Sequence, residues 1–336
     1  MKDSCTVLIS SAGRRVELLR CLRRDAADLG IGLRVLAADH RPAWSAACHA
    51  ADAAFAVPRC EDPGFVPHML ALCATEKVDL VVPTIDPELL PLSQAQARFA
   101  EIGTRVAVSS PEVVALARDK LATARHLAAA GIAVPATATL DEVAAAPEAW
   151  RWPLLVKPRG GSASAGIQRL ESPDQLEALD DPAGLIAQAL LEGPEYTVNL
   201  FFDQAGALRC AVPHERVEIR AGEVAKGVTR RHARLEAVAK SVAGTLDGAR
   251  GALCLQAILD AAGEPHVFEL NARFGGGFPL AHRAGAPFSC WLLEEVTGRP
   301  STCGDAWRDG TVMLRYDAAV FTSEADLRQI AAQGAD

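Results

Sequence analysis

Short apolar runs alternate with amphipathic segments in the first third of the chain. The runs at residues 6–10, 33–39 and 78–83 have the length of buried strands, and residues 16–29 carry apolar side chains at helical spacing. Strands that alternate with helices favour a parallel, doubly wound sheet. Ligands of such sheets bind at the carboxyl ends of the strands, so the polar residues that follow each run are candidates for a site.

Two pairs of charged residues follow the first and third of these strands. Arg14 and Arg15 open the helix after the first strand, where they are either ligands for an anion or solvated side chains. Asp86 and Glu88 lie in a rigid turn after the third strand, where they either receive an amine or cap the next helix. Both interpretations stay open for each pair.

The middle of the chain places two lysines beside unusual features. Lys120 directly precedes a predicted helix at residues 121–130, and Lys157 lies inside an apolar strand at residues 152–158. A lysine in an apolar strand costs free energy unless it meets an anion or reaches water. The glycine- and serine-rich residues 159–166 follow at once and offer backbone N–H groups to phosphate oxygens, although their spacing is not that of a P-loop.

Polar side chains alternate with apolar ones along the strand predicted at residues 267–273. Successive side chains of a strand point to opposite faces, so Glu269, Asn271 and Arg273 project together from one of them. That face is either simply exposed to solvent, as in many antiparallel sheets, or it is a site for chemistry.

A hairpin partner for this strand lies just upstream, at residues 253–259. If the turn is centred on residues 262 and 263, Gln256 falls opposite Glu269 on the same face. A carboxylate, two carboxamides and an arginine would then face one site, which suits a hard cation held by oxygen ligands. Three glycines at residues 275–277 expose backbone N–H groups next to it.

A second polar hairpin is predicted at residues 215–227, with its turn at residues 221 and 222. It is either an ordinary exposed hairpin, or it brings Arg216 or Lys226 near a transferred phosphate or a substrate carboxylate. Arg283, in the helical stretch that follows, is a similar candidate.

Composition narrows the class of protein. The formal net charge of −8 and the pI near 5.6 argue against a nucleic-acid surface. Nine cysteines without Cys-x-x-Cys spacing are typical of reduced thiols and indicate no zinc site. The apolar run at residues 5–9 is too short for a signal segment or a membrane span. We expect a cytoplasmic protein that acts on small molecules, without nucleic-acid or membrane partners.

The order of these parts resembles the ATP-grasp superfamily over nearly the whole chain. Lys120 with the Gly-Ile-Ala-Val-Pro segment at residues 131–135, Lys157 with its small-residue loop, and the stretch at residues 186–198 are similar to the family's two phosphate lysines and its hinge. The resemblance implies an α/β fold: an N-terminal doubly wound pre-ATP-grasp domain, followed by a two-part α+β ATP-grasp fold. The division would be 1–108 for the first domain, 109–185 for the lid and 186–336 for the subdomain with the metal site.

The resemblance also implies roles for individual residues. Gln256, Glu269 and Asn271 match the family's Mg²⁺ ligands, with Mn²⁺ as an alternative ion, and Arg273 matches a catalytic arginine; Lys226 is added as a second catalytic candidate. Family members usually have glutamate where Gln188 stands, and many have a carboxylate where Gln256 stands. The implied ATP-binding residues are Lys120, Lys157, Gly160, Gly161, Ser162, Ser164, Gln188, Ala189, Leu190, Leu191 and Glu195.

Several motifs are similar to the stand-alone, carbamoyl-phosphate-synthetase-like ligases of the superfamily. These are Ser-Ala-Gly-Arg-Arg, Pro-Thr-Ile-Asp-Pro-Glu and Phe-Glu-Leu-Asn-Ala-Arg-Phe-Gly-Gly-Gly. This resemblance implies an ATP-dependent ligase that joins a small carboxylate to an amine through an acylphosphate and releases ADP and phosphate. Candidate substrate contacts are Arg14, Arg15, Asp86, Glu88, Arg216, Gly276, Gly277 and Arg283.

Three other functions are weighed against this one. A reaction through carboxyphosphate and a non-catalytic ATP-binding regulatory module are the alternatives. A dinucleotide-dependent oxidoreductase is disfavoured, because Gly13 stands without the glycine fingerprint that such enzymes need. Dimers are frequent in the family, so a homodimer is expected from the resemblance.

Overall fold

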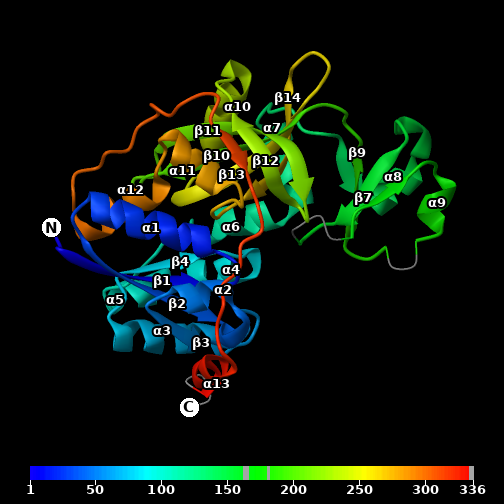
Figure 1. Cartoon of the computed structure of the whole chain (residues 1–336). Coiled ribbons are helices and arrows are strands. Elements are labelled where there is room, and N and C mark those ends of the chain that lie inside the picture. The colour runs from blue at the N-terminus through cyan, green and yellow to red at the C-terminus, as the bar shows by residue number, and fades with distance from the viewer. Residues whose placement is uncertain (162–165, 180–181, 333–336) are drawn as a thin grey trace.

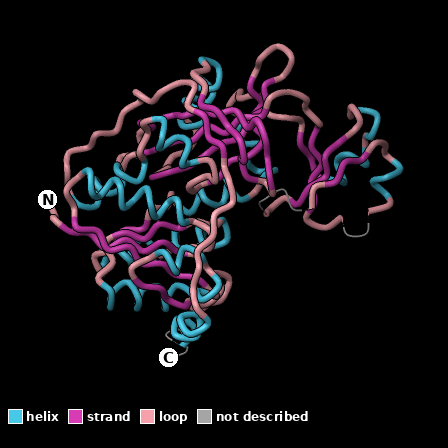
Figure 2. Tube along the Cα trace, in the orientation of Figure 1, coloured by secondary structure: helices cyan, strands magenta, loops and turns pink. Residues whose placement is uncertain are grey.

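The computed structural model describes residues 1–161, 166–179 and 182–332. Its strands form three sheets that follow one another along the chain (Figures 1 and 2). The sheets of the first and last thirds lie close to each other, with helices between and around them. The smallest sheet, from the middle third, stands apart on the right of Figure 1.

The first sheet is parallel and five-stranded, in the order β3-β2-β1-β4-β5. The predicted alternation of strands and helices is confirmed, and β3 and β5 are strands that the apolar pattern did not reveal. The strands are β1 (Ser4–Ser10), β2 (Gly32–Asp39), β3 (Ala53–Ala56), β4 (Leu80–Pro83) and β5 (Arg105–Val106). The helices around them are α1 (Val16–Asp28), α2 (Ala46–Ala50), α3 (Phe65–Glu76), α4 (Asp86–Gln94) and α5 (Gln96–Glu101), with a 3₁₀ turn η1 (Pro42–Trp44).

Two helices lead from this sheet to the middle one. α6 (Pro111–Arg118) begins at Ser110, whose hydroxyl accepts from the Val113 backbone, and α7 (Lys120–Ala129) begins at Asp119, whose carboxylate accepts from two backbone N–H groups of the first turn. The middle sheet is antiparallel, in the order β6-β9-β7-β8. It contains β6 (Thr137–Thr139), β7 (Leu154–Pro158), β8 (Gln168–Leu170) and β9 (Leu185–Ala189), with α8 (Leu140–Ala145), α9 (Asp174–Glu177) and a 3₁₀ turn η2 (Pro147–Ala149).

This middle unit has a small core of its own. Val143, Leu154, Val156 and Ala187 are completely buried within it. Lys157 follows Val156 on β7 and points to the opposite face, as the alternation of strand side chains requires. The core therefore fixes the face on which Lys157 is presented.

The third sheet is antiparallel and six-stranded, in the order β14-β13-β10-β11-β12-β15. The hairpin predicted from residues 253–271 is confirmed, including its register, because Gln256 pairs with Glu269. The second hairpin, with its turn at residues 221 and 222, is also present. The strands are β10 (Glu195–Phe202), β11 (Leu208–Arg220), β12 (Glu223–Thr229), β13 (Gly251–Leu259), β14 (Pro265–Asn271) and β15 (Val312–Leu314).

Helices α10 (Ala233–Ala243), α11 (Phe278–Ala284) and α12 (Phe288–Thr297) accompany this sheet. α12 joins it to the first domain: Phe201 of β10 packs against Phe288 and Trp291 of α12, while α12 also packs against α1. A buried polar contact lies at the same junction, where His282 Nε2 is 2.8 Å from Asp25 Oδ1. Together these contacts hold the first and third sheets in a defined relation.

The last part of the chain returns to the first domain. β15 pairs with β12 at the edge of the third sheet, and the chain then runs across the molecule to α13 (Glu324–Ala332), drawn in red in Figure 1. α13 packs against η1 and β3. Within the described residues, no helix combines the length and the apolar character needed to cross a bilayer.

Candidate active site

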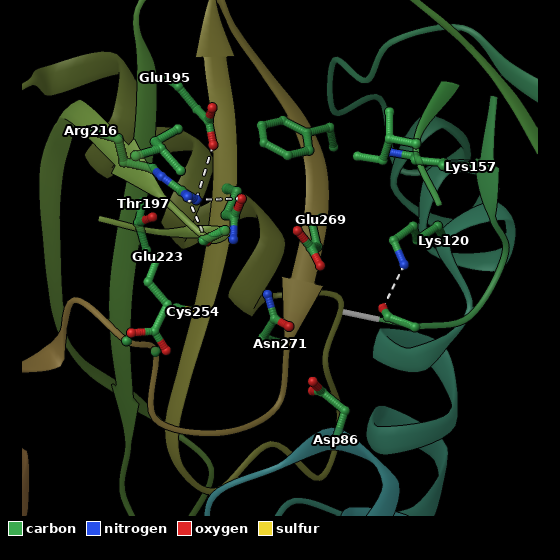
Figure 3. Close-up of a pocket in the computed structure, with 18 of the residues that line it drawn as sticks. Asp86, Lys120, Lys157, Glu195, Thr197, Arg216, Glu223, Cys254, Glu269 and Asn271 are labelled. Carbon is green, nitrogen blue, oxygen red and sulfur yellow. Dashed lines mark hydrogen bonds and ion pairs between the residues drawn. The ribbon is translucent and has the colours of Figure 1, made fainter. Parts of the chain in front are cut away.

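A cavity of about 350 Å³ lies where the three sheets meet (Figure 3). Its walls come from β7 and β9 of the middle sheet, from strands β10 to β14 of the third sheet, and from the loops after β1 and β4 of the first. This volume is within the range of small-ligand pockets. The polar face of β14, predicted from the alternation at residues 267–273, lines this cavity, so that strand face is not simply exposed to solvent.

Lys157 is 6 % exposed and lines the cavity from β7. Its Nζ donates to Gln188 Oε1 over 2.7 Å and lies 5.7 Å from the centre of the Phe268 ring. Burial lowers the pKa of Lys157 to about 8; the Glu269 carboxylate opposes this effect and Lys120 adds to it. No ion pair of Lys157 with a carboxylate is present in the described part of the chain. The site therefore contains a buried cation that is ready to meet an anion.

Lys120, at the start of α7, lines the same cavity and donates to the Gly161 carbonyl over 2.8 Å. Arg159, at the start of the small-residue loop, is held by Asp119 through contacts of 2.5–2.8 Å. These bonds attach the beginning of the loop to the amino end of α7. Gly160 and Gly161 line the cavity, whereas Ser162 and Ser164 lie outside the described residues.

Glu269 and Asn271 project from β14 into the cavity, as the alternation predicts (Figure 3). Among the described residues the Glu269 carboxylate has no hydrogen bond and no ion pair, and Asn271 Oδ1 receives one long contact of 3.3 Å from Arg273 Nη2. A carboxylate and an amide oxygen in this arrangement fit a hard cation such as Mg²⁺. The described residues contain no cluster of three or more His, Cys, Asp or Glu side chains that could hold a metal, so any ligand set here is mixed.

Gln256 differs from the other two ion-ligand candidates because its side-chain oxygen already accepts a hydrogen bond from an arginine. Arg216 Nη1 donates to Gln256 Oε1 over 2.8 Å and lies 3.0 Å from Glu195 Oε1. The side chain of Arg216 is only 5 % exposed. Burial raises the pKa of Glu195, and the charge of Arg216 opposes that shift. A divalent ion on Gln256 would meet the guanidinium charge at close range, so this residue fits a metal less well than Glu269 and Asn271.

Arg273 connects β14 to the first domain. Its Nη2 lies 2.8 Å from Asp86 Oδ2, at the amino end of α4, and its Nη1 donates to the Phe274 carbonyl over 3.1 Å. Burial disfavours its charge, but the neighbouring carboxylate of Asp86 prevails and raises the pKa of Arg273 above its usual value. Asp86 is thus half of an ion pair between two domains, at the edge of the cavity.

Close neighbours surround the three glycines after β14. An added Cβ would lie 3.0 Å from Cys254 Sγ at Gly275, 2.8 Å from the Glu223 carboxyl carbon at Gly276, and 2.6 Å from His214 Nε2 at Gly277. Burial lowers the pKa of His214 to about 3, so its ring is neutral. All three glycines line the cavity, and their main chain reaches it because no side chain stands in the way.

Replacing Gly277 with alanine is expected to destabilise the protein by about 1–3 kcal/mol, the usual cost of overpacking. The ring of His214 cannot withdraw because it is completely buried. Gly304→Ala is the matched control, since its added Cβ has only one neighbour, at 3.9 Å. Thermal denaturation should show a clear loss for Gly277→Ala and almost none for Gly304→Ala, and equal midpoints would contradict this account of the glycines.

An arginine that the sequence pattern did not reveal contacts two of the residues that line the cavity. Arg315, just after β15, donates to Glu223 Oε2 over 2.6 Å and to the Gly276 carbonyl over 2.5 Å. Arg15 lines the cavity, and within the described residues its guanidinium makes only long contacts, 3.5 Å to Glu223 Oε1 and 3.4 Å to the Thr84 carbonyl. Burial alone would raise the pKa of Glu223, but Arg15 and Arg315 lower it. No local motif surrounds Arg315, because its partners are 92 and 39 residues away in the chain.

Removing the Arg315 side chain, as in Arg315→Met, is expected to lower the free energy of unfolding by about 1 kcal/mol, because two hydrogen bonds of a charged donor are lost on a partly exposed side chain. Arg220→Met is the control: Arg220 pairs with Asp317 in the same region, but both side chains are largely exposed. Urea denaturation should separate the two variants. Equal losses would mean that Arg315 contributes no more than a surface ion pair.

The structure leaves five of the sequence candidates outside the cavity, as far as its described residues go. Lys226 is half exposed and pairs with Glu218, Arg14 and Arg283 are exposed, and Leu190 does not line the cavity. Glu88 is completely buried, and its carboxylate accepts from the backbone N–H groups of Thr84 and Ile85. Burial raises the pKa of Glu88. Of its two interpretations, the helix-capping one describes this geometry.

The remaining candidates come together in the one cavity. Strands that are distant in sequence supply them, and two different domains supply the pair Arg273 and Asp86. The candidates that line it are Arg15, Asp86, Lys120, Lys157, Gly160, Gly161, Gln188, Ala189, Leu191, Glu195, Arg216, Gln256, Glu269, Asn271, Arg273, Gly276 and Gly277.

Comparison with protein families agrees with this geometry. Residues 7–107 match the model of the PylC-like N-terminal domain, and residues 117–277 match the model of the ATP-grasp domain. The chain therefore contains an ATP-grasp domain preceded by a PylC-like N-terminal domain. The expected fold class, a mixed α/β N-terminal domain followed by an ATP-grasp domain, is confirmed. The ATP-grasp match contains both lysines, the hinge after β9 and the polar face of β14, whereas Arg315 lies beyond it.

Two curated relatives of this ATP-grasp chain are D-alanine–D-alanine ligases. The protein of Halorhodospira halophila is 35 % identical over 109 residues, which are 30 % of this chain and 35 % of the relative. The protein of a Marinomonas species is 32 % identical over 120 residues, which are 33 % of this chain and 38 % of the relative. The matched part thus spans little more than a third of the length of these relatives.

Solved structures share the fold at low sequence identity. The N5-carboxyaminoimidazole synthetase of Staphylococcus aureus has a TM-score of 0.70 at 16 % identity and covers 94 % of this chain and 81 % of its own. The L-amino acid ligase of Bacillus licheniformis has a TM-score of 0.67 at 20 % identity, with coverages of 88 % and 75 %. The biotin carboxylase of Campylobacter jejuni has a TM-score of 0.70 at 16 % identity, with coverages of 88 % and 71 %. At such identities the likeness establishes the fold alone.

Proposed function

We propose that this protein is an ATP-dependent ligase that joins a carboxylate to an amine. One observation carries the proposal: Lys120 and Lys157, neither of which has a carboxylate partner among the described residues, face the same cavity as Glu269, a carboxylate without a cationic partner. Two free cations suit the phosphates of ATP, and a free carboxylate suits the divalent ion that accompanies them. Each group lacks in the protein what Mg·ATP would supply.

The chain's own residues would then divide the work as follows. Lys120 and Lys157 balance the charge of the phosphates, and the Gln188–Leu191 hinge and Glu195 hold the nucleoside, as the family resemblance implies. Glu269 and Asn271 hold Mg²⁺, with Mn²⁺ as a substitute, and the bound ion would lower the negative charge on the phosphate oxygens. In this division Gln256 no longer binds the ion but orients Arg216.

The reacting groups would meet at the carboxyl end of β14. A substrate carboxylate oxygen attacks the γ-phosphorus, the bond to the β-phosphate oxygen breaks, and ADP leaves with the electron pair. Arg273 stabilises the charge of the transferred group, and the main chain of Gly275–277 lies where the oxygen of the acyl carbon would acquire charge. The nitrogen of an amine then attacks this carbon, and the bond from the carbon to the phosphate oxygen breaks. The phosphate leaves with that electron pair and takes up the proton that the nitrogen loses as the amide forms.

The comparisons support this proposal but do not identify the substrates. The partial matches to D-alanine–D-alanine ligases and the fold shared with an L-amino acid ligase support amide formation. The fold shared with biotin carboxylase supports the alternative reaction through carboxyphosphate, which would use the same ATP site. A regulatory module that binds ATP without turnover is the second alternative; it would not need Glu269 and Arg273, and both are present.

The domain boundaries, the cellular location and the partners are part of the same proposal. The division into 1–108, 109–185 and 186–336 stays part of the proposal: the first and third sheets lie within the first and last ranges, whereas β9 of the middle sheet extends past residue 185. A cytoplasmic location is supported by nine free cysteines. The partners would be a small carboxylate, an amine and a second copy of the chain; one structural neighbour is described as a dimer.

Phosphate release from Mg·ATP by the purified protein tests the proposal. The protein is supplied with pooled small carboxylic acids, pooled amino acids and amines, both pools together, or bicarbonate. Release that requires a carboxylate and an amine together supports the ligase, and deconvolution of the pools identifies the substrates. Release with bicarbonate alone would favour carboxyphosphate, and ATP binding without release under any condition would favour the regulatory module.

A further inference from the structure

A chain of hydrogen bonds runs from Lys157 away from the cavity into the middle sheet. Lys157 Nζ donates to Gln188 Oε1 over 2.7 Å, Gln188 Nε2 donates to Thr137 Oγ1 over 2.9 Å, and Thr137 Oγ1 donates to the Pro135 carbonyl over 2.8 Å. Strands β7, β9 and β6 are adjacent, with Leu155 and Thr137 paired to Gln188 from either side. The four groups therefore cross the sheet in one direction.

The direction of this chain is dictated by its last member. The Pro135 carbonyl can only accept a hydrogen bond, so the Thr137 hydroxyl donates its hydrogen to this carbonyl. The hydroxyl oxygen then accepts a hydrogen bond from Gln188. Only the amide nitrogen of Gln188 can donate to this oxygen, so the amide oxygen of Gln188 faces Lys157 and accepts from its ammonium group. The Gln188 side chain is only 3 % exposed, so water has little access to satisfy a reversed amide.

The same geometry leaves the charge of Lys157 uncompensated. Its hydrogen-bond acceptor is a neutral amide and its other close neighbour is the Phe268 ring. The charged groups that act on it are Glu269 of β14, which favours the cation, and Lys120 of α7, which disfavours it. Glu269 forms no ion pair with Lys157 in the described residues. A carboxylate in place of the amide would neutralise the ammonium and weaken its attraction for an anion.

We propose that Thr137 and Gln188 are positioning residues for Lys157: they fix the direction of its ammonium group while leaving its whole positive charge for the anion in the cavity. The proposal rests on the proposed function in one respect, the identity of that anion as the phosphates of a nucleotide. Thr137 does not line the cavity among the described residues and acts only through Gln188.

A pH dependence follows from this arrangement. Lys157 has a pKa of about 8 because of its burial. Phosphates bind the protonated form, so nucleotide affinity should be constant below pH 8 and fall as the pH rises above it. A variant that removes the hydrogen bond to Lys157 should start this fall at lower pH. A variant that adds a carboxylate should start it at higher pH.

The test measures binding of adenylyl imidodiphosphate with Mg²⁺ by calorimetry between pH 7 and 9. Thr137→Val is expected to weaken binding by about tenfold at neutral pH, as loss of one buried hydrogen-bond partner does, and to move the fall to lower pH. Thr137→Ser keeps the hydroxyl and should match the wild type. Gln188→Glu should also weaken binding at pH 7 but move the fall to higher pH, and this opposite shift is one that mere structural damage would not produce.

A second measurement reports on Lys157 directly. The chain has only six lysines, so their side-chain carbon resonances can be titrated in the protein without nucleotide. The Lys157 midpoint should lie near 8 in the wild type, lower in Thr137→Val and higher in Gln188→Glu. If the Lys157 titration midpoint and the nucleotide affinity of both variants equal those of the wild type, the positioning role of Thr137 and Gln188 is overturned. Failure of the wild type to bind the nucleotide would instead overturn the proposed site and, with it, this role.

Discussion

Replacing Glu269 with glutamine is expected to reduce phosphate release from Mg·ATP by about a hundred- to a thousandfold. This corresponds to a rise of about 2.7–4 kcal/mol in the barrier, the scale measured when one preorganised electrostatic group is lost. Glutamine keeps the shape of the side chain but removes the only carboxylate that projects from β14 into the cavity without a cationic partner among the described residues. The loss should appear mainly in the turnover rate, and raising the Mg²⁺ or Mn²⁺ concentration should recover part of it.

The control for this variant is Glu264→Gln, in the turn that joins β13 and β14. Glu264 lies on the surface, where it pairs with Arg234 at 2.8 Å, and both side chains are about half exposed. An exposed pair of this kind contributes little, so activity and stability should hardly change. If the Glu269→Gln variant turned over as fast as the wild type, Glu269 would not be the acidic ligand of the ion, and the proposed ion site would be contradicted.

Replacing Arg273 with methionine is expected to reduce turnover by a similar factor and to destabilise the fold as well. The first effect follows from its place at the end of β14, beside Asn271 and the glycines. The second follows because Asp86 would keep a mostly buried carboxylate without its partner, and breaking a buried pair in this way costs about 3–5 kcal/mol. Turnover and thermal denaturation should therefore both respond.

A double replacement separates the two effects. In Arg273→Met with Asp86→Asn no carboxylate is left unpaired, so stability should return toward the wild type while turnover stays low. Arg273→Lys keeps the charge but cannot make the three contacts of the guanidinium, and it should recover activity only in part. Full activity in the double variant would show that Arg273 serves the domain contact alone. Arg283→Met, on the exposed end of α11, is the control and should resemble the wild type.

The positions that the sequence predicted well are those whose geometry depends on neighbours along the chain. Alternation within β14 placed Glu269 and Asn271 on one face, and the short turn of the hairpin placed Gln256 opposite Glu269. The apolar strand around Lys157 was also evident, because a lysine in such a strand has a cost that the sequence alone reveals. In each case a few consecutive residues contain the information.

The positions that the sequence predicted poorly are those whose geometry depends on distant partners. Lys226 alternates along its strand as an active-site residue could, but it lies on the face that pairs with Glu218 in solvent. Glu88 follows a strand like Asp86, yet it turns inward to accept backbone N–H groups. Gln256 has the expected register, but Arg216 of another strand occupies its oxygen. Arg315 has no motif at all.

The sequence by itself therefore determined the order of the elements, the register of the β13–β14 hairpin and the presence of an ATP-grasp domain. Hydrophobic periodicity and turn chemistry act over a few residues, so they can be recognised without knowing where the chain goes next. Only the tertiary structure decided which charges remain free and which are paired. Pairing depends on distances between residues far apart in the chain, such as the 2.8 Å between Arg273 and Asp86, which are 187 positions apart. That sorting leaves Lys120, Lys157 and Glu269 without charged partners in the described structure, and the proposed chemistry rests on these three residues.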